Sequence, residues 1–425
     1  ECTLPGDKSL THRVALFAAL AEGESRVGNF LRAGVTQAML GALSDFGVDW
    51  ALDGDTLIIQ GRGPSELHSP KNVLNCGNSG TTLWLLAGAL AGANVSCILD
   101  GSSGLRTRPM GRIVEPLCAM GVRIQAAPGD VAPLTLESRP EGEALQALEI
   151  SLPVASAQVK TAILLAGLGA QGTTDLREPG PSRDHTERLL ASMGVEIMRD
   201  PQIHRVRLQP PDSPLRPLNL DLPGDISSAA FLIVAALIVP GSDLLLKGIG
   251  LNPTRVGLLD VLQKMGASIE FHNLKEVHGE PMGDLRIQTS ELVGIRVEGP
   301  LVVRMIDEFP IFAVAAALAR GKTTVSEAEE LRHKESDRIS SLCRELHNMG
   351  VKIEEKPDGF VIEGGVRPRG GVCVASHGDH RLAMALSVAG LAAEEPTGVE
   401  GAEIINESFP EFTAILRGFG AEATS

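Results

Sequence analysis

The sequence has few aromatic residues and no disulfide or zinc-binding pattern. It has no Tyr among 425 residues, and only two Trp and eleven Phe, so the core must be built chiefly from Ala, Leu, Val and Ile. The six cysteines are scattered, without a CxxC pair. This pattern indicates reduced thiols rather than a disulfide or zinc framework. We therefore expect a protein of a reducing, cytoplasmic compartment.

Long hydrophobic runs and an excess of positive charge are also missing. The longest apolar run, residues 229–239, is well short of the roughly 20 residues that a membrane span needs. No signal-peptide pattern opens the sequence. The net charge of −15 opposes binding to nucleic acid or to an anionic membrane. We expect neither partner, and a small anion can bind only where cations converge locally.

Glycine, by contrast, is abundant, with 47 residues, and six of them mark an internal repeat. The tripeptide Met-Gly-Val, or a close relative, recurs at intervals of 70 to 84 residues. The glycines are Gly47, Gly121, Gly194, Gly266, Gly350 and Gly420. Each follows a helical pattern and precedes a short strand, which predicts a left-handed glycine at a helix C-terminus.

A polar turn and then a helix rich in Ala and Leu precede each of these glycines. The turns are Gly6-Asp7-Lys8-Ser9, Gly77-Asn78-Ser79-Gly80, Ala155-Ser156-Ala157-Gln158, Gly224-Asp225-Ile226-Ser227, Ile306-Asp307-Glu308-Phe309 and Gly378-Asp379-His380-Arg381. The helices that follow, 14–20, 83–91, 161–168, 229–239, 312–319 and 382–392, are apolar nearly all round. We expect them to be buried with sheets outside. Their N-termini, gathered at a cleft, would favour anions.

The matching tripeptides Pro5-Gly6-Asp7 and Pro223-Gly224-Asp225 divide the six units into two sets of three. We predict an α/β protein with two domains, residues 7–222 and residues 1–6 plus 223–425. The chain is expected to cross between the domains at both tripeptides.

Several cations lie near predicted helix starts. Lys8 falls in a first helical turn, where a cation opposes the helix dipole, and Arg183 directly precedes another helix. Lys334 and Arg338 share one helix side with Glu335 beside them. A carboxylate held among cations is typical of general acid–base chemistry. Taken alone, polar residues at helix starts are more often plain N-caps, and charged runs are usually solvated faces.

Neither a metal nor a nucleotide cofactor is expected. His377 and His380 lack a third ligand at a convincing spacing. Residues 167–172 match the pattern GxGxxG, but they end a helix and precede a strand. That order is the wrong context for a dinucleotide site.

Eight linked motifs resemble those of the 5-enolpyruvylshikimate-3-phosphate synthase (EPSP synthase) family, in order and from residue 4 to about residue 412. They are Pro5-Gly6-Asp7-Lys8-Ser9 with Arg13, Gly77-Asn78-Ser79-Gly80-Thr81, Arg108-Pro109-Met110, Ser156-Ala157-Gln158-Val159-Lys160, Arg183-Asp184-His185-Thr186-Glu187, Pro223-Gly224-Asp225-Ile226-Ser227, Lys334-Glu335-Ser336-Asp337-Arg338 and Asp379-His380-Arg381. The resemblance implies two similar domains that close over substrate. Each would hold three βαβαββ units with buried parallel helices and outer sheets, an inside-out α/β barrel.

The resemblance also implies a reaction and its residues. A monomer would transfer the enolpyruvyl group of phosphoenolpyruvate to the 5-hydroxyl of shikimate 3-phosphate in the shikimate pathway of aromatic amino-acid biosynthesis, releasing phosphate. Shikimate 3-phosphate would contact Lys8, Ser9, Arg13, Ser156, Ala157, Gln158, Arg183, Asp307 and Lys334. Phosphoenolpyruvate would contact Lys8, Asn78, Gly80, Arg108, Gln158, Arg338 and Arg381. Asp307 would be the base for the 5-hydroxyl, and Glu335, with Lys8, would protonate the methylene carbon and later remove that proton.

Three departures from the family pattern concern specificity. Trp84 stands where the family usually carries Arg, and Glu407 stands where it carries Lys or a hydroxyl residue. Several motifs resemble the glyphosate-tolerant class, although Gly80 lacks the methyl group that some tolerant members have there. We expect glyphosate to be a possible inhibitor, with reduced affinity.

Two other functions are compatible with this sequence. The first is that of a UDP-N-acetylglucosamine enolpyruvyl transferase, which would share the fold but usually carries a reactive Cys before Arg-Pro; residues 102–107 contain none. The second is that of a non-catalytic anion-binding protein. The presence of both acids, Asp307 and Glu335, argues against it.

Overall fold

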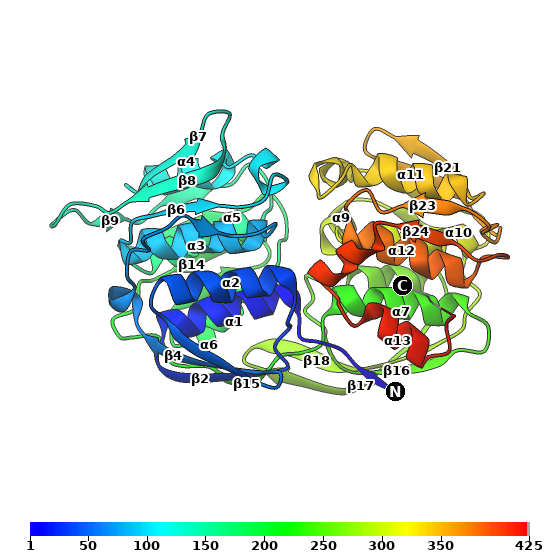
Figure 1. Cartoon of the computed structure of the whole chain (residues 1–425), viewed down its shortest axis with the longest axis horizontal. Helices are drawn as coiled ribbons and strands as arrows, with labels where there is room; N and C mark the ends of the chain where they lie inside the picture. The colour runs from blue at the N-terminus through cyan, green and yellow to red at the C-terminus, as the bar shows by residue number, and fades with distance from the viewer. Residues whose placement is uncertain (423–425) are drawn as a thin grey trace. The chain divides into compact units, whose positions relative to one another are not determined.

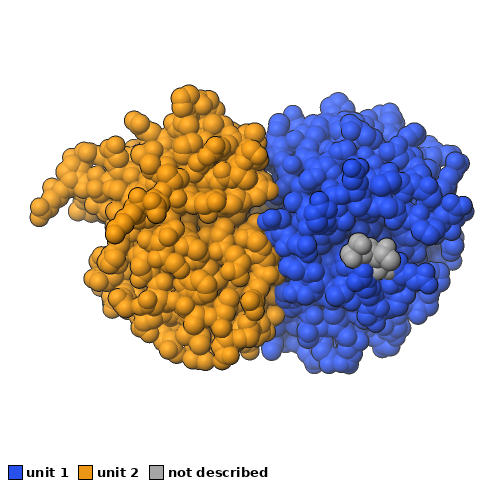
Figure 2. Space-filling view, in the orientation of Figure 1, with its two compact units in different colours: residues 1–5, 223–276, 281–425 blue, residues 6–222, 277–280 orange. Residues whose placement is uncertain are grey.

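The computed structural model describes residues 1–422 and divides into two compact units (Figures 1 and 2). Unit 2 comprises Gly6–Leu222 and Val277–Glu280, and unit 1 comprises Glu1–Pro5, Pro223–Glu276 and the chain from Pro281 onward. Gly6 and Val277–Glu280 were expected in the C-terminal domain but belong to unit 2. The Gly6 amide donates to the Asn29 carbonyl at 3.1 Å, and Arg188 donates to the Gly279 carbonyl, which ties both segments to unit 2.

Unit 2 repeats one succession of elements three times. The first repeat contains α1 (Lys8–Leu20), β2 (Glu22–Gly28), α2 (Gly34–Asp45), β3 (Asp49–Asp53) and β4 (Thr56–Arg62). The second contains β5 (Leu74–Asn75), α3 (Gly80–Ala93), β6 (Cys97–Asp100), α4 (Gly111–Ala119), β7 (Arg123–Ala127) and β8 (Val131–Glu137). The third contains β10 (Glu149–Ser151), α5 (Ala157–Gly167), β12 (Thr174–Arg177), α6 (His185–Ser192), β13 (Ile197–Asp200) and β14 (Arg205–Leu208). The 3-10 turns η1 (Pro64–Glu66) and η2 (Leu105–Thr107) and the short strand pair β9 (Leu145–Gln146) and β11 (Ala170–Gln171) lie between them.

The three sheets of unit 2 share one strand order. They run β15-β2-β4-β3, β5-β6-β8-β7 and β10-β12-β14-β13, where β15 (Asn219–Asp221) comes from the end of the unit. In each sheet the first two strands are parallel and the remaining pairs are antiparallel. A parallel pair needs a crossover connection, which the buried helix provides in the second and third repeats. The predicted βαβαββ unit is therefore confirmed.

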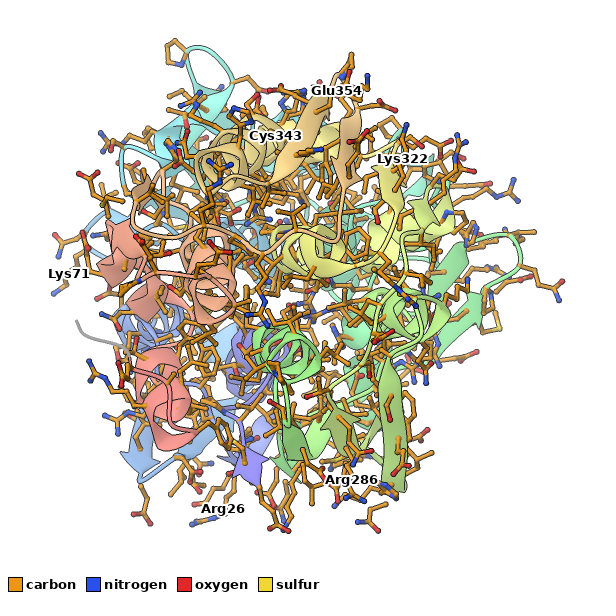
Figure 3. The ribbon with its side chains drawn as sticks, turned by 90° about the vertical axis from the view of Figure 1, so that its right-hand side faces the viewer. Arg26, Lys71, Arg286, Lys322, Cys343 and Glu354 are labelled. Carbon is orange, nitrogen blue, oxygen red and sulfur yellow. The ribbon has the colours of Figure 1, made fainter. Side chains whose placement is uncertain are left out.

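Unit 1 follows the same plan. The first repeat contains β1 (Cys2–Thr3), α7 (Ile226–Ile238), β16 (Asp243–Gly250), α8 (Gly257–Lys264), β17 (Ser268–Val277) and β18 (Glu280–Gln288). The second contains β19 (Arg296–Val297), α9 (Pro300–Arg304), α10 (Phe309–Leu318), β20 (Lys322–Val325), η3 (Glu329–His333), α11 (Arg338–Asn348), β21 (Lys352–Lys356) and β22 (Gly359–Glu363). The last contains β23 (Cys373–Ala375), α12 (His380–Leu391), β24 (Gly398–Glu400), η4 (Ala402–Glu407) and α13 (Phe412–Gly418). Figure 3 shows α11, which carries Cys343, beside the strand that carries Glu354.

The sheets of unit 1 run β1-β16-β18-β17 and β19-β20-β22-β21, and the last repeat, as far as residue 422, contains the parallel pair β23-β24. The short strand expected after Gly420 lies largely outside the described residues. Throughout residues 1–422 the strands of a unit form separate sheets and not a closed barrel. Within the same residues, no helix combines the length and the hydropathy that crossing a bilayer requires.

The predicted helix ends are confirmed. The six repeat glycines all follow a helix and have φ between 83° and 98°, a region open to glycine but costly for other residues. At the opposite ends, Asp7, Ser79, Ser156, Asp225 and Asp379 each accept a backbone N–H at the start of an apolar helix. The local sequence thus determines where these helices begin and end.

The apolar helices pack against one another inside each unit. Helices α3 and α5 approach closely at Gly88, where a Cβ atom would lie 2.2 Å from the carbonyl oxygen of Ala162. Gln158 at the start of α5 donates to Thr81 at the start of α3 (2.6 Å). Arg13 in α1 donates to Thr161 in α5 (3.0 Å). The N-terminal turns therefore lie together, so the buried helices of unit 2 run parallel, as predicted.

Candidate active site

The predicted site residues form two polar clusters, one in each unit, where helix N-termini meet. Cluster A, in unit 2, contains Lys8, Ser9, Arg13, Asn78, Gly80, Arg108, Ser156, Ala157, Gln158 and Arg183. Cluster B, in unit 1, contains Asp307, Lys334, Glu335, Arg338 and Arg381.

Arg13 lies at the base of cluster A and is buried. Its guanidinium donates to the Ser9 carbonyl (3.0 Å) and to the hydroxyls of Thr161 (3.0 Å) and Thr186 (2.9 Å). Burial lowers the pKa of Arg13 to about 10, which still leaves it charged at neutral pH. Its contacts tie α1 to the starts of α5 and α6.

The loop before α6 brings Arg183 to Ser9. The Nη1 atom of Arg183 lies 3.5 Å from the Ser9 hydroxyl, and both residues are half-buried. Asp184 stands at the N-cap position of α6, but its side chain makes no capping bond and pairs instead with Arg188 (2.9 Å) and Arg199 (2.8 Å). Two arginines, from α6 and β13, thus take the carboxylate from the backbone.

Gly80 and Arg108 meet at the start of α3. A Cβ atom on Gly80 would lie 2.9 Å from Nη1 of Arg108, so the absent side chain leaves room for this guanidinium. Asn78 accepts from the hydroxyl of Ser102 at 3.0 Å. With Gln158 bonded to the same turn, these groups form a set of polar atoms around the starts of α3 and α5.

Lys160 is a buried charge whose role the sequence analysis missed. Its Nζ atom lies 2.8 Å from a carboxylate oxygen of Glu178 and 2.8 Å from one of Glu187. Burial acts to lower the pKa of Lys160, but the two carboxylates outweigh it and raise the pKa above its usual value. Lys160 directly precedes residues 161–168, a helix expected to be buried on every side. A lysine at such a position requires partners for its charge, and that was the available signal.

His12 is a second buried residue that the sequence analysis did not single out. Its Nδ1 lies 2.8 Å from the Lys8 carbonyl oxygen, and its Nε2 lies 3.2 Å from the Val35 carbonyl oxygen and 3.3 Å from the Ser79 hydroxyl. Burial lowers the pKa of His12 to about 4, so the imidazole is neutral in the folded protein. The ring ties the starts of α1 and α3 together.

The depressed pKa of His12 predicts a loss of stability in mild acid. The unfolded chain protonates this histidine near pH 6.5 and the folded chain only near pH 4, so the free energy of unfolding falls as the pH drops through this window. The loss from this one group at pH 5 should be about 2 kcal/mol. Urea unfolding at pH 7.5 and pH 5 should show this loss in the parent and not in His12→Gln.

A matched control for this pH effect is His347→Gln, because His347 is exposed on α11. This variant should lose as much stability between the two pH values as the parent does. An equal loss in His12→Gln would contradict the assignment.

Arg338 is the centre of cluster B. Its side chain is 1% exposed and pairs with Asp379 (2.7 Å), Glu335 (2.7 Å) and Asp307 (3.3 Å). Burial acts to lower the pKa of Arg338, but the three carboxylates raise it above its usual value. For Asp379, burial acts to raise the pKa, and Arg338 outweighs that effect and lowers it. One cation is thus surrounded by three carboxylates.

Only two of these carboxylates are accessible to a substrate. The side chain of Asp379 is fully buried, whereas that of Asp307 is 17% exposed and that of Glu335 is 27% exposed. Asp379 also accepts the backbone N–H groups of Arg381 and Leu382, which places it in a structural role. General acid–base chemistry can therefore fall to Asp307 and Glu335.

Arg381 lies at the start of α12, next to Asp307. Its guanidinium lies 3.3 Å from the Asp307 carbonyl oxygen and 3.7 Å from the Glu308 carboxylate. Glu308 accepts from the Ser227 hydroxyl, to which Arg255 donates at 2.7 Å. The buried network behind Arg381 was also missed, because its members lie up to 81 residues apart.

Three further positions singled out in the sequence are Lys334, Trp84 and Glu407. Lys334 is half-buried and directly follows η3, beside Glu335. The Trp84 indole points its Nε1 at the Met110 sulfur (3.2 Å) and packs against the core of unit 2, so this position is a packing contact. Glu407 ends η4 and is partly exposed. Residues 1–422 contain no group of three or more His, Cys, Asp or Glu side chains arranged to hold a metal ion.

Comparison with known proteins matches this architecture to one family. The family model of EPSP synthase (3-phosphoshikimate 1-carboxyvinyltransferase) matches residues 1–416. The 3-phosphoshikimate 1-carboxyvinyltransferase of Citrifermentans bemidjiense is 48% identical over 98% of this chain and 96% of that protein. That of Petrotoga mobilis is 45% identical over the same shares of both chains.

Solved structures agree. EPSP synthase from Acinetobacter baumannii superposes with a TM-score of 0.88 at 40% identity, covering 98% of this chain and 94% of that one. The enolpyruvyl transferase NikO from Streptomyces tendae, at 18% identity and a TM-score of 0.77 over 99% and 94% of the chains, shares the fold. The chain belongs to the EPSP synthase family.

Proposed function

We propose that the chain transfers the enolpyruvyl group of phosphoenolpyruvate to the 5-hydroxyl of shikimate 3-phosphate, giving 5-enolpyruvylshikimate 3-phosphate and phosphate. The observation that carries this proposal is the pair of accessible carboxylates, Asp307 and Glu335, held on one buried arginine. The curated relatives over nearly the whole chain carry the name of this activity.

The proposed reaction is an addition followed by an elimination. Asp307 accepts the proton of the 5-hydroxyl while the oxygen of that hydroxyl bonds to C2 of phosphoenolpyruvate. Glu335, with Lys8, delivers a proton to the methylene carbon. The adduct then loses phosphate from C2 as Glu335 takes a proton back from the methyl group, which restores the double bond. Each proton thus has an acceptor, and no redox step or covalent enzyme intermediate is required.

Substrate binding is assigned to both clusters. Shikimate 3-phosphate would contact Ser9, Ser156, Ala157, Gln158, Arg183 and Lys334, and phosphoenolpyruvate would contact Asn78, Gly80, Arg108, Gln158 and Arg381, with Lys8 serving both. Arg13 and Arg338 contact hydroxyls and carboxylates of their own unit. We infer that Arg13 acts mainly by holding Ser9 in place. The positive charge of Arg338 is partly neutralised by its three carboxylate partners, so its attraction for an anionic substrate is reduced.

The rival transfer to UDP-N-acetylglucosamine is disfavoured because the buried cysteines Cys76 and Cys97 lack the reactive thiol that such a transferase usually carries. Burial raises the pKa of Cys76 and of Cys97 to about 12, so neither thiol is reactive at neutral pH.

We further propose that the protein works as a cytoplasmic monomer and that glyphosate inhibits it weakly. Size-exclusion chromatography and an inhibition constant against phosphoenolpyruvate test these two statements.

The deciding measurement is phosphate release from purified protein mixed with shikimate 3-phosphate and phosphoenolpyruvate, with each substrate omitted in turn. Release that requires both supports the proposal. Release with UDP-N-acetylglucosamine in place of shikimate 3-phosphate would establish the rival transfer. If shikimate 3-phosphate bound without phosphate release under any condition, the chain would be an anion-binding protein.

Replacing Gly80 with alanine should weaken phosphoenolpyruvate binding. The new methyl group would contact the guanidinium of Arg108 at 2.9 Å and displace it, at little cost in stability because that end is flexible. We expect KM for phosphoenolpyruvate to rise about tenfold, equivalent to ~1.4 kcal/mol. KM for shikimate 3-phosphate, measured in the same assay, should stay within about twofold and is the internal control. A parallel rise of both constants would contradict this assignment of Arg108.

A further inference from the structure

One buried carboxylate, that of Glu178, connects three segments of unit 2. Glu178 follows β12, and its Oε1 accepts the backbone N–H of Ser156 at 3.0 Å. Its Oε2 accepts from the Ser182 hydroxyl at 2.8 Å and lies 2.8 Å from Nζ of Lys160. The side chain of Glu178 is only 4% exposed, so its oxygens interact with these protein groups and hardly with solvent.

Two of these segments carry residues assigned to shikimate 3-phosphate. Ser156 is the N-cap of α5, and Ser182 directly precedes Arg183 at the start of α6. The Ser156 oxygen accepts the Val159 N–H at 3.5 Å. Because the oxygen is the acceptor in this bond, the hydroxyl proton is available for an anion. A single carboxylate therefore fixes both loops before any ligand arrives.

The charge of Glu178 is compensated locally. An isolated buried carboxylate would be costly, and it would also repel a phosphate bound nearby. Lys160 pairs with Glu178 and with Glu187, and Glu187 in turn attracts Arg13. Two cations and two carboxylates thus balance, so Glu178 can hold the loops without presenting a net negative charge.

We propose that Glu178 is a positioning residue for the phosphate group of shikimate 3-phosphate, with Lys160 as its buried counter-ion. The inference rests on the proposed function. Glu178 acts through Ser156 and the Arg183 loop and contacts no substrate itself. Donors fixed in advance bind an anion more tightly because less conformational entropy is lost on binding.

Glu187 offers a matched control. It lies at the same 2.8 Å from Lys160 and is also buried, with 1% of its side chain exposed against 4% for Glu178. Among the described residues, however, it makes no hydrogen bond to either loop. Glu178→Gln and Glu187→Gln each remove one of the two negative charges that pair with Lys160. Only the first replaces the acceptor shared by the Ser156 amide and the Ser182 hydroxyl.

The experiment measures binding of shikimate 3-phosphate and of shikimate, which lacks the phosphate, by titration calorimetry and by competition. For Glu178→Gln we expect about tenfold weaker binding of shikimate 3-phosphate, with binding of shikimate and kcat at saturation changed less than about threefold. For Glu187→Gln both ligands should bind within about threefold of the parent. Equal weakening in the two variants would reduce Glu178 to a charge partner of Lys160 and overturn the proposal.

A third variant covers the case in which Glu178→Gln does not fold. Ser182→Ala removes one of the bonds to Glu178 without unbalancing a buried charge, and it should weaken binding of shikimate 3-phosphate but not of shikimate. If Ser182→Ala weakened neither, the proposal would be overturned. A parent protein that binds shikimate 3-phosphate no better than shikimate would instead overturn the proposed function itself.

Discussion

Replacement of Glu335 by glutamine is expected to lower kcat by at least about 100-fold, the usual contribution of a general acid–base group. Glutamine has nearly the same shape but cannot donate the proton to the methylene carbon or take it back. The fold should survive, because Arg338 keeps its contacts with Asp379 and Asp307. Phosphate release at saturating substrates measures kcat, and titration calorimetry should show shikimate 3-phosphate bound within about threefold of the parent.

Glu329→Gln is the control for this prediction. Glu329 is an exposed carboxylate in η3, six residues before Glu335, so its replacement changes the net charge equally and should leave kcat unchanged. A loss of less than tenfold in Glu335→Gln would show that another group transfers the proton. The same loss in both variants would show that net charge in this segment matters, and not a specific acid.

Replacement of Gly88 by alanine should destabilise the protein by about 3 kcal/mol, the upper end of what overpacking a core costs. The added Cβ atom would lie 2.2 Å from the Ala162 oxygen and 2.6 Å from its Cα. These are backbone atoms of α5, so relief requires moving two buried helices apart. Urea unfolding, followed by circular dichroism, measures the loss of free energy.

The same substitution at Gly41 provides the matched control. Gly41 lies within α2, and a Cβ atom there would meet no described atom within 4 Å. Alanine should therefore stabilise this helix by about 0.4–1 kcal/mol, since it restricts the unfolded chain more than glycine does. If Gly88→Ala were no less stable than Gly41→Ala, the close approach of α3 and α5 would not exist in solution.

Features with a short-range cause could be predicted from the sequence. The glycine after each amphipathic helix has a left-handed conformation because its own turn requires it, and Asp7 and Asp225 cap the helices that follow them directly. The all-round apolar character of the buried helices also indicated their position in the core. The resemblance to one family then identified the residues of the two clusters.

Features that depend on distant partners could not be predicted in this way. Asp184 has the position of a cap, yet two arginines take its carboxylate. Arg13 and Lys160 were visible as cations, but nothing near them in the chain shows that both are committed to buried hydroxyls or carboxylates.

The sequence by itself determined the repeat, the helix boundaries, the division into two sets of three units and the family, because these follow from local backbone preferences and from side-chain patterns along the chain. Only the tertiary structure decided which charges remain accessible. Asp307, Glu335 and Asp379 meet on Arg338 from three different segments. Burial then leaves two of these carboxylates accessible and encloses the third, since desolvation depends on everything that packs around a group.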